Sequence, residues 1–160
     1  MAREEAKSGT ATSNDYDVFL SFRGPDTRNI FADFLYVFMK NKGIRVFRDE
    51  EELSPGEKIS EILRAVESSQ IYIPIFSKNY ASSRWCLREL KYMVDGHGKH
   101  PSKRILPIFY NVDPEDVKLE TELYKSALTE HEEDPDCTDW KEALTSVARI
   151  KGWHIKDQRY

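Results

Sequence analysis

The sequence predicts an α/β protein of the flavodoxin-like, doubly wound type, with a five-stranded parallel sheet and helices on both of its faces. Short apolar runs alternate along the chain with segments whose apolar residues recur at helical spacing, which is typical of parallel strands joined by crossover helices. The 160 residues, 39% of them hydrophobic and 32% charged, are enough for one domain with a sizeable core.

Five apolar runs are predicted as strands, each bounded by polar or turn residues. They are residues 16–22, 44–47, 71–76, 104–110 and 152–155. Pro74 and Pro107 fall inside two of these runs, and proline has no N–H to donate to a neighbouring strand. We therefore expect those two strands to lie toward one side of the sheet or to be interrupted locally.

The segments between the strands are predicted as helices. Asp26 can cap the first one and Gly43 can end it. The apolar face of this helix is expected to consist of Ile30, Phe31, Phe34, Leu35 and Phe38. Further helices are expected at 59–66, 83–94, 113–131 and 138–150, with residues 96–101 as a connector.

The ends of the chain and its composition limit the classes of function. Residues 1–14 are small and polar and are predicted to be a flexible leader without the apolar core of a secretory signal. The domain is expected at 15–156, and residues 157–160 are expected to be a tail cut off before further domains.

A net charge of −4 argues against nucleic acid or an anionic membrane as the main partner. No apolar run approaches the roughly 20 residues that span a bilayer.

The only cysteines, Cys86 and Cys137, form neither a metal-ligand cluster nor a disulfide framework. Two free thiols indicate a reducing compartment, so we expect a cytoplasmic or nuclear protein that binds no metal.

A candidate site follows the predicted strand 71–76. Ligands of doubly wound sheets bind just beyond the carboxyl ends of the strands, where residues 77–90 stand. Trp85 and Glu89 are four residues apart on the predicted helix, so they share a face. No basic residue stands three or four positions from Glu89 on its own helix, which makes this carboxylate a candidate reactive group.

Two classes with this architecture lack their defining residues. A phosphoacceptor receiver needs an aspartate at the end of the third strand, where Phe76 and Ser77 stand. A nucleotide-binding module needs a glycine-rich phosphate loop, and neither common pattern occurs.

A third class matches through motifs that occur in order along the chain. They are FLSFRGPDTR at 19–28, FRD at 47–49 leading to Leu53 and Gly56, S-x-x-Y-x-x-S-x-W-C-L-x-E-L at 77–90, ILPIFY-x-VDP at 105–114 and GWHI at 152–155. With these motifs, residues 16–155 resemble the Toll/interleukin-1 receptor (TIR) domains of plant nucleotide-binding, leucine-rich-repeat resistance proteins.

The resemblance implies hydrolysis of NAD+ to nicotinamide and ADP-ribose-type products, which promote defence and cell death. The family's catalytic glutamate falls on Glu89. NAD+ would be the substrate rather than a cofactor, with NADP+ and ATP as other candidate ligands. The expected pocket residues are Arg23, Gly24, Ser77 and Trp85, and the loop expected over the site includes Asp49, Ser54 and Gly56.

The same residues also have simpler interpretations. Trp85 is either a wall of the pocket or part of the core, and Arg23 is either a phosphate contact near a helix N-terminus or a surface arginine. Cys86 is interpreted as a packing residue. The loop from Asp49 to Gly56 could be an ordinary solvated acidic loop.

One carboxylate can suffice for this chemistry. Most glycosidases need a second acid to protonate the leaving group. The nicotinamide of NAD+ is already cationic and leaves as a neutral molecule, so the remaining task is to stabilise an oxocarbenium-like ribose. Glu89 alone could do this.

Self-association with other TIR domains, including copies of this chain, is the second implied property. Relatives use the first helix, where this chain has Asp33 and Phe34; the helical pattern also places Phe34 in the core. The alternative to the enzyme is a non-catalytic TIR–TIR docking module, and a nucleic-acid-processing assembly is a third possibility that the acidic charge disfavours.

Overall fold

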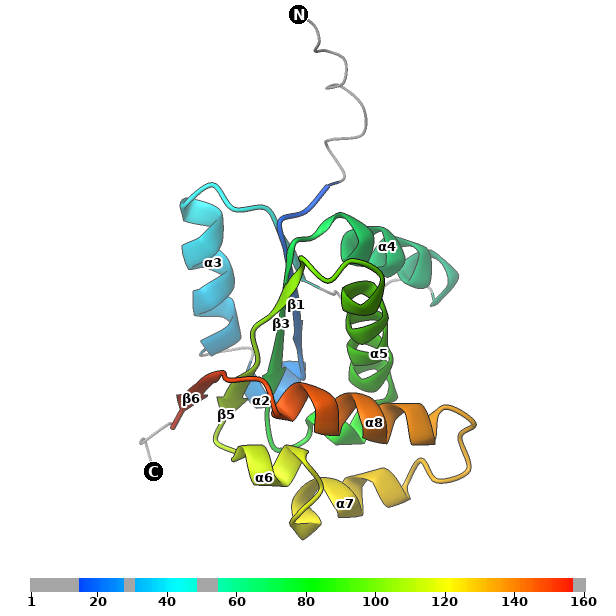
Figure 1. The fold of residues 1–160 in the computed structure, drawn as a ribbon. Helices are drawn as coiled ribbons and strands as arrows, with labels where there is room; N and C mark the ends of the chain where they lie inside the picture. The colour runs from blue at the N-terminus through cyan, green and yellow to red at the C-terminus, as the bar shows by residue number, and fades with distance from the viewer. Residues whose placement is uncertain (1–14, 28–30, 49–54, 157–160) are drawn as a thin grey trace, which may run out of the picture.

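The computed structural model describes residues 15–27, 31–48 and 55–156 (Figure 1). Its sheet has the order β2-β1-β3-β5-β6, with β4 also paired to β3, and every strand pair is parallel. The strands are β1 (Val18–Phe22), β2 (Val46–Arg48), β3 (Ile71–Phe76), β4 (Arg104–Ile105), β5 (Ile108–Tyr110) and β6 (Trp153–Ile155). The parallel, doubly wound sheet predicted from the sequence is confirmed.

Helices cover both faces of this sheet, as predicted (Figure 1). The helices are α2 (Gly24–Thr27), α3 (Asp33–Asn41), α4 (Pro55–Ser68), α5 (Arg84–Lys99), α6 (Pro114–Val117), α7 (Glu122–Thr129) and α8 (Cys137–Ala148), with a 3-10 turn η3 (Tyr80–Ser82). Helix α3 lies on one face, while α4, α5 and α8 lie on the other. Within the described ranges, no helix is long and apolar enough to cross a membrane.

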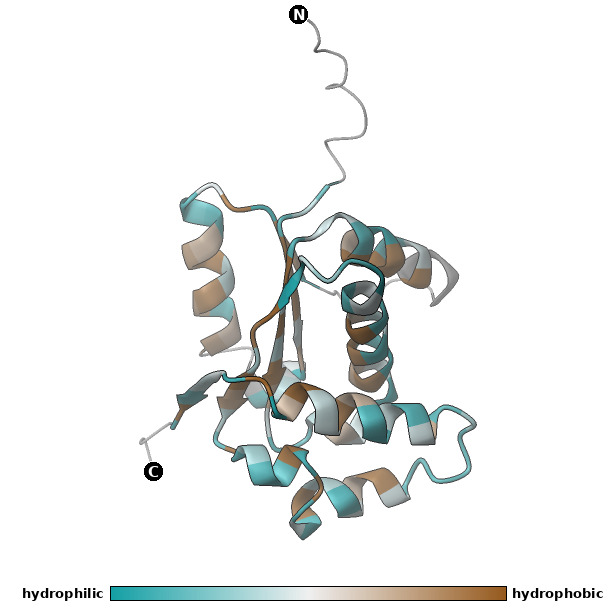
Figure 2. Ribbon diagram, in the orientation of Figure 1, coloured by the Kyte–Doolittle hydropathy of each residue, from teal (hydrophilic) through white to brown (hydrophobic). Residues whose placement is uncertain are grey.

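Two buried clusters fill the layers between the sheet and its helices, and alternate residues of β1 belong to different clusters. Phe19 packs with the residues of α4, α5 and α8, and Leu20 packs with those of α3. The strands and the sides of α5 and α8 that face the sheet are accordingly apolar, and α3 is apolar over much of its surface (Figure 2). Because successive strand residues face opposite sides, Ser21 points to the same face as Phe19, toward α5.

The two strand prolines have different outcomes. Pro107 divides the expected fourth strand into β4 and β5, which confirms a local interruption. Strand β3 pairs with β4 through Ile71 and Tyr72 and with β5 through Ile75 and Phe76, so Pro74 falls at the gap between the two ladders. The other expectation, a place toward one side of the sheet, is wrong for β3, which lies between β1 and β5.

Two helix predictions are also wrong. Helix α5 continues to Lys99 through the expected connector, and a Cβ on Gly96 would lie 2.5 Å from the Tyr72 hydroxyl, so the glycine lets this helix pack closely on β3. The helix expected over 113–131 is two helices, because Leu119 adopts a φ of 67° that no helix accommodates.

Helix α3 is rotated relative to the prediction. Met39 is buried and Leu35 packs against the same cluster, as predicted for Leu35, whereas Phe34 is 66% exposed and Phe38 49% exposed. The sequence is apolar around most of this helix, so its periodicity did not decide which side faces the sheet. The expectation that Phe34 and Phe38 lie in the core is wrong.

Candidate active site

The carboxyl ends of β1 and β3 lie side by side, because the two strands are parallel neighbours with Phe22 opposite Ile75. The segments that follow them begin with Arg23 and Ser77. Ser83 caps the next helix, α5, with its hydroxyl accepting from the Cys86 N–H at 3.1 Å. This cap sets where α5 begins and hence which of its residues face β1.

Glu89 is one of the residues of α5 that face β1. Its side chain is buried, with the residue 2% exposed. The Ser21 hydroxyl donates to Oε1 of Glu89 at 2.7 Å. A carboxylate this deeply buried is rarely placed for packing alone, since removing it from water opposes folding.

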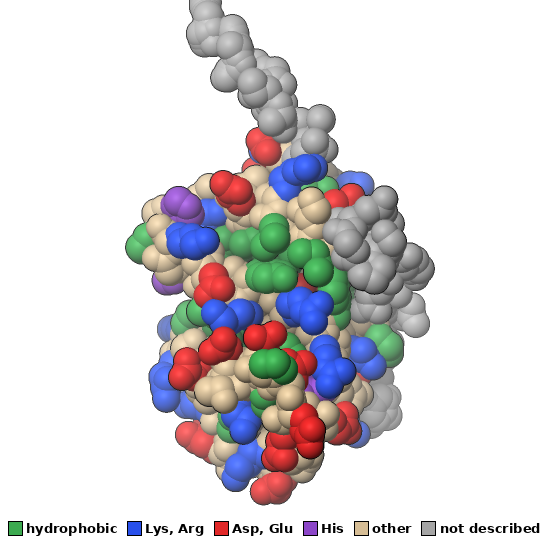
Figure 3. All heavy atoms as spheres, turned by 90° about the vertical axis from the view of Figure 1, so that its right-hand side faces the viewer, with side chains coloured by type: hydrophobic (Ala, Val, Ile, Leu, Met, Phe, Trp, Pro, Cys, Tyr) green, Lys and Arg blue, Asp and Glu red, His purple; other side chains and the backbone are tan. Residues whose placement is uncertain are grey.

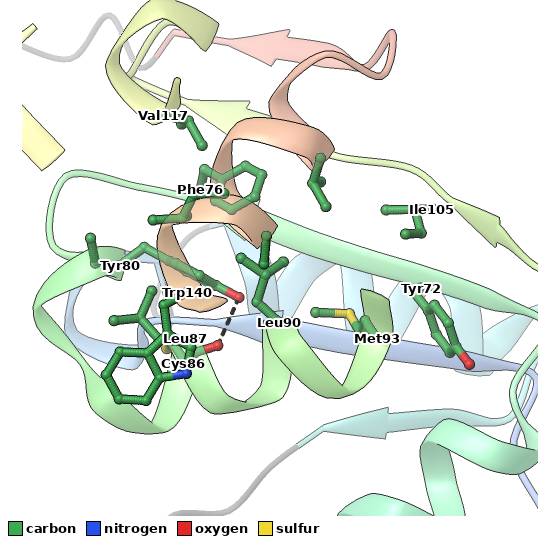
Figure 4. Close-up of a cluster of buried hydrophobic side chains, with 14 of the residues drawn as sticks. Tyr72, Phe76, Tyr80, Cys86, Leu87, Leu90, Met93, Ile105, Val117 and Trp140 are labelled. Atoms are coloured by element: carbon green, nitrogen blue, oxygen red, sulfur yellow. Dashed lines mark hydrogen bonds between the residues drawn. The ribbon is translucent and has the colours of Figure 1, made fainter. Parts of the chain in front are cut away.

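Tyr80 completes the contacts on the Ser21 side of the glutamate. Its hydroxyl lies 2.8 Å from Ser21 Oγ and donates to the Cys86 carbonyl at 3.2 Å, a bond drawn in Figure 4. Burial raises the pKa of Tyr80 well above its usual range, and the neighbouring Cys86 and Glu89 act in the same direction. The phenol therefore stays protonated at neutral pH.

The other residues predicted for the pocket lie around these strand ends. Trp85 is half-buried against the core, and the Arg88 guanidinium stands 5.4 Å from its ring centre. Trp85 thus packs against the core while keeping an accessible part. Arg23 is partly exposed directly after β1, and Gly24 is buried at the start of α2. Their contacts with NAD+ stay predictions.

Asp26 joins the two loops that follow β1 and β3. Its carboxylate accepts from the Ser77 hydroxyl at 2.6 Å, from the Asn79 N–H at 2.8 Å and from the Asn79 side-chain amide at 3.0 Å. The prediction that Asp26 caps a helix is therefore wrong. Ser77 is 1% exposed, and its hydroxyl donates its proton to Asp26. The expected contact of Ser77 with NAD+ stays a prediction.

We expect Asp26→Ala to lower the free energy of unfolding by about 2 kcal/mol, because hydrogen bonds to a charged group contribute more than neutral ones. Chemical denaturation followed by circular dichroism measures this loss. The control replaces the exposed Asp95, which forms an ion pair with Lys91 one turn earlier on α5, and should change stability by less than about 0.5 kcal/mol. Equal effects of the two substitutions would contradict the role of Asp26 as a link between loops.

Only some of the residues expected in the covering loop lie within the described ranges. Asp49 and Ser54 lie outside the described residues, and Gly56 stands in the first turn of α4. Asp33 forms an ion pair with Arg48 at the end of β2, and its role in self-association stays a prediction. Among the described residues, no group of three His, Cys, Asp or Glu side chains could hold a metal ion.

A hollow of about 370 Å³ lies between α4 and α5, apart from the glutamate. Figure 3 shows this side of the molecule, with apolar side chains grouped in its upper half among charged ones. The hollow is lined by Leu63, Val66, Glu67, Tyr92, Asp95, Gly96, Lys99, His100 and Lys103. The buried ammonium of Lys103 donates to the Val66 carbonyl at 3.0 Å and to the Glu67 carbonyl. Its charge therefore caps the C-terminus of α4.

The site residues that the sequence missed are Ser21, Tyr80 and Asp26. One signal could have found Ser21, a polar residue in an otherwise apolar strand and on the same face as Phe19. Tyr80 and Asp26 stand within the quoted motifs, but the motifs do not encode their contacts with Ser21 and Ser77, which are far away in the sequence.

Comparison with known proteins agrees with this geometry. The family model described as "TIR domain" matches residues 15–160. Disease resistance protein RPV1 of Vitis rotundifolia is 45% identical over 91% of this chain, and TMV resistance protein N of Nicotiana glutinosa is 41% identical over 92%. The chain spans only 10% and 13% of the lengths of these two relatives.

Among solved structures, the TIR domains of the activated Roq1 resistosome, described as directly recognizing the pathogen effector XopQ, superpose with a TM-score of 0.77. They are 42% identical to this chain, and the match covers 88% of it and 87% of the Roq1 chain. Sequence motifs, sheet order and these similarities agree: the chain belongs to the TIR domain family, and its relatives are plant disease resistance proteins.

Proposed function

We propose that this domain hydrolyses the bond between nicotinamide and ribose in NAD+ and acts as a self-associating TIR domain in plant immune signalling. The observation that carries the proposal is Glu89, a buried acid that coincides with the family's glutamate motif and lies beside the carboxyl end of the central strands. Such a carboxylate is rare unless function requires it.

In the proposed reaction the C–N bond breaks and its electron pair moves to the nicotinamide nitrogen, which becomes neutral. The ribose develops positive charge, and the Glu89 carboxylate stabilises it. Water then adds to the ribose carbon and loses a proton, which gives ADP-ribose. Because Glu89 is 2% exposed, substrate reaches the carboxylate only after neighbouring segments move, so activity should depend on conditions that open the site.

The direct test follows nicotinamide release by chromatography while the protein concentration is varied with NAD+ in excess. The proposal expects release that grows faster than the protein concentration if assembly opens the site. The Glu89→Ala variant, purified in the same way, controls for contaminating hydrolases. Absence of release from the wild type at every concentration would overturn the enzymatic proposal and leave the docking module.

Self-association is supported by the outer side of α3. Phe34, Val37 and Phe38, which we call the α3 patch, are all about half exposed or more, and the rings of Phe34 and Phe38 stack at 6.2 Å. Neighbouring apolar side chains left in water mark an interaction surface. The Roq1 relative is described as an activated resistosome, in the plural "TIR domains".

We expect the double substitution Phe34→Ala and Phe38→Ala to weaken self-association about tenfold or more, because the variant loses apolar area at the interface. Sedimentation velocity over a concentration series measures this. The matched control is Leu63→Ala, which removes an apolar side chain that is 46% exposed on α4. An unchanged association constant in the double variant would exclude the α3 patch as the interface.

The two candidate functions give different results in a cell-death assay. If the domain is only a docking module, Glu89→Ala keeps signalling while loss of the α3 patch abolishes it. If the proposed enzyme is correct, both changes abolish signalling, because assembly and hydrolysis are then steps of one process.

A further inference from the structure

We propose that Ser21 and Tyr80 form a buried hydroxyl relay that orients Glu89 and favours its ionised form, a positioning role that rests on the proposed hydrolysis of NAD+. These residues come from β1 and from the η3 turn, whereas the glutamate comes from α5. The relay therefore joins the three elements that meet at the carboxyl end of the sheet.

Counting the protons fixes the direction of the relay. The single Ser21 proton is donated to Glu89 Oε1 at 2.7 Å. The Ser21 oxygen must then accept at its 2.8 Å contact with the Tyr80 hydroxyl, so Tyr80 is the donor there. The Tyr80 proton is shared with the Cys86 carbonyl, which lies farther away at 3.2 Å. The order is Tyr80 to Ser21 to Glu89.

Burial makes this relay strong. Ser21 and Tyr80 are both 0% exposed, so water does not compete for their hydrogen bonds. Each donor polarises the next one in a medium of low dielectric constant. A donor aimed at a carboxylate stabilises its charged form, which is the form that can stabilise a cationic ribose.

The rotamers of the relay are also restricted. The Tyr80 ring packs edge-on against Phe76 with centroids 5.1 Å apart, and both lie in the apolar cluster that includes Leu87 and Leu90 of α5 (Figure 4). Besides Glu89, the titratable groups that act on Tyr80 are the Cys86 thiol on α5 and the Tyr124 phenol on α7, and the same cluster also contains the Tyr72 phenol. Burial raises the pKa of Tyr124 well above its usual range, so it adds no charge near neutral pH.

The first experiment measures the pH dependence of nicotinamide release in Ser21→Ala. We expect kcat to fall about tenfold with little change in KM, since the donor acts on the carboxylate rather than on bound substrate. The acid limb of the rate profile should move to higher pH, because the ionised carboxylate loses its donor. Ser21→Thr keeps a hydroxyl and should restore the wild-type limb.

The matched control is Ser69→Ala. Ser69 is also 0% exposed, and its hydroxyl has no hydrogen-bond partner among the described residues, so this variant removes a buried hydroxyl away from the glutamate. Its rate profile should match the wild type. A shift of equal size in Ser69→Ala and Ser21→Ala would mean that buried hydroxyls matter only for general stability, and would overturn the relay.

The second experiment does not depend on activity. Carbon-13 labelling of the glutamate carboxyl groups allows the Glu89 titration to be followed by NMR in the full chain. Its midpoint should move to higher pH in Ser21→Ala and, by a smaller amount, in Tyr80→Phe. Tyr72→Phe is the control, because this equally buried phenol donates to the Val66 carbonyl at 2.7 Å instead.

The outcomes separate the two proposals. If the wild type releases no nicotinamide but the Glu89 titration moves as expected, the proposed function fails and the relay stands. If the wild type is active and neither the rate profile nor the titration changes in Ser21→Ala, the relay is wrong. If Ser21→Ala does not fold, the Tyr80→Phe titration decides by the same criterion.

Discussion

Glu89→Ala is expected to reduce nicotinamide release about a thousandfold, which corresponds to roughly 4 kcal/mol of lost transition-state stabilisation. The reason is the charge that develops on the ribose in the proposed reaction, when the cationic nicotinamide departs. In a buried site a fixed carboxylate stabilises this charge more than water does, because the dielectric constant is low. The measurement is the single-turnover rate with enzyme in excess, which separates chemistry from product release.

Glu89→Gln sharpens the test, since it keeps the size of the side chain and an oxygen that can accept from Ser21 while it removes the charge. We expect nearly the same loss of rate as in Glu89→Ala. Glu122→Gln on α7 is the matched control, because that side chain is 83% exposed and the change should leave the rate unchanged. A Glu89→Gln rate within twofold of the wild type would show that the charge is not required.

Gly152→Ala is expected to lower the free energy of unfolding by about 3 kcal/mol, as for strong overpacking. A Cβ at this position would overlap the backbone carbonyl of Pro107. The same carbonyl accepts the Trp153 N–H at 3.0 Å, so a shift of this backbone would break the hydrogen bond between the start of β6 and the residue before β5. For a protein of this size, the melting temperature should fall by roughly 6–12 °C.

Gly98→Ala provides the matched control. This glycine lies inside α5, and a Cβ there would meet no atom within 4 Å. Alanine favours a helix more than glycine, so this variant should gain about 0.5–1 kcal/mol. If Gly152→Ala melts within about 1 °C of the wild type, residue 152 does not need to be glycine, and the close approach of β6 to Pro107 is wrong.

The order of the strands along the chain and the segment that carries the site could be predicted from the sequence. Apolar runs with breakers at their ends mark β1 and β3 well, because a strand buried on both faces is apolar throughout. The predicted helix ends were less accurate where a glycine allows close packing. Gly96 resembles a helix end in the sequence, but it allows α5 to contact Tyr72.

Within the site, the motif identified Glu89 and Trp85 but not the residues that hold the glutamate. Ser21 and Glu89 are 68 positions apart in the sequence, and Ser21 and Tyr80 are 59 apart. Their contact depends on how β1, η3 and α5 pack, which local periodicity does not encode. Asp26 shows the same limit, since a residue suited to cap a helix binds Ser77 instead.

By itself, the sequence determined the fold class, the strand–loop–helix segment of the candidate site and the position of the acid within that segment, because these depend on the spacing of apolar and polar residues along the chain. Only the tertiary structure decided that Glu89 is buried against Ser21 and that Phe34 faces solvent. Both depend on the rotation of a helix against the sheet. That rotation follows from the summed packing of many distant side chains, and several rotations are compatible with a helix that is apolar on more than one side.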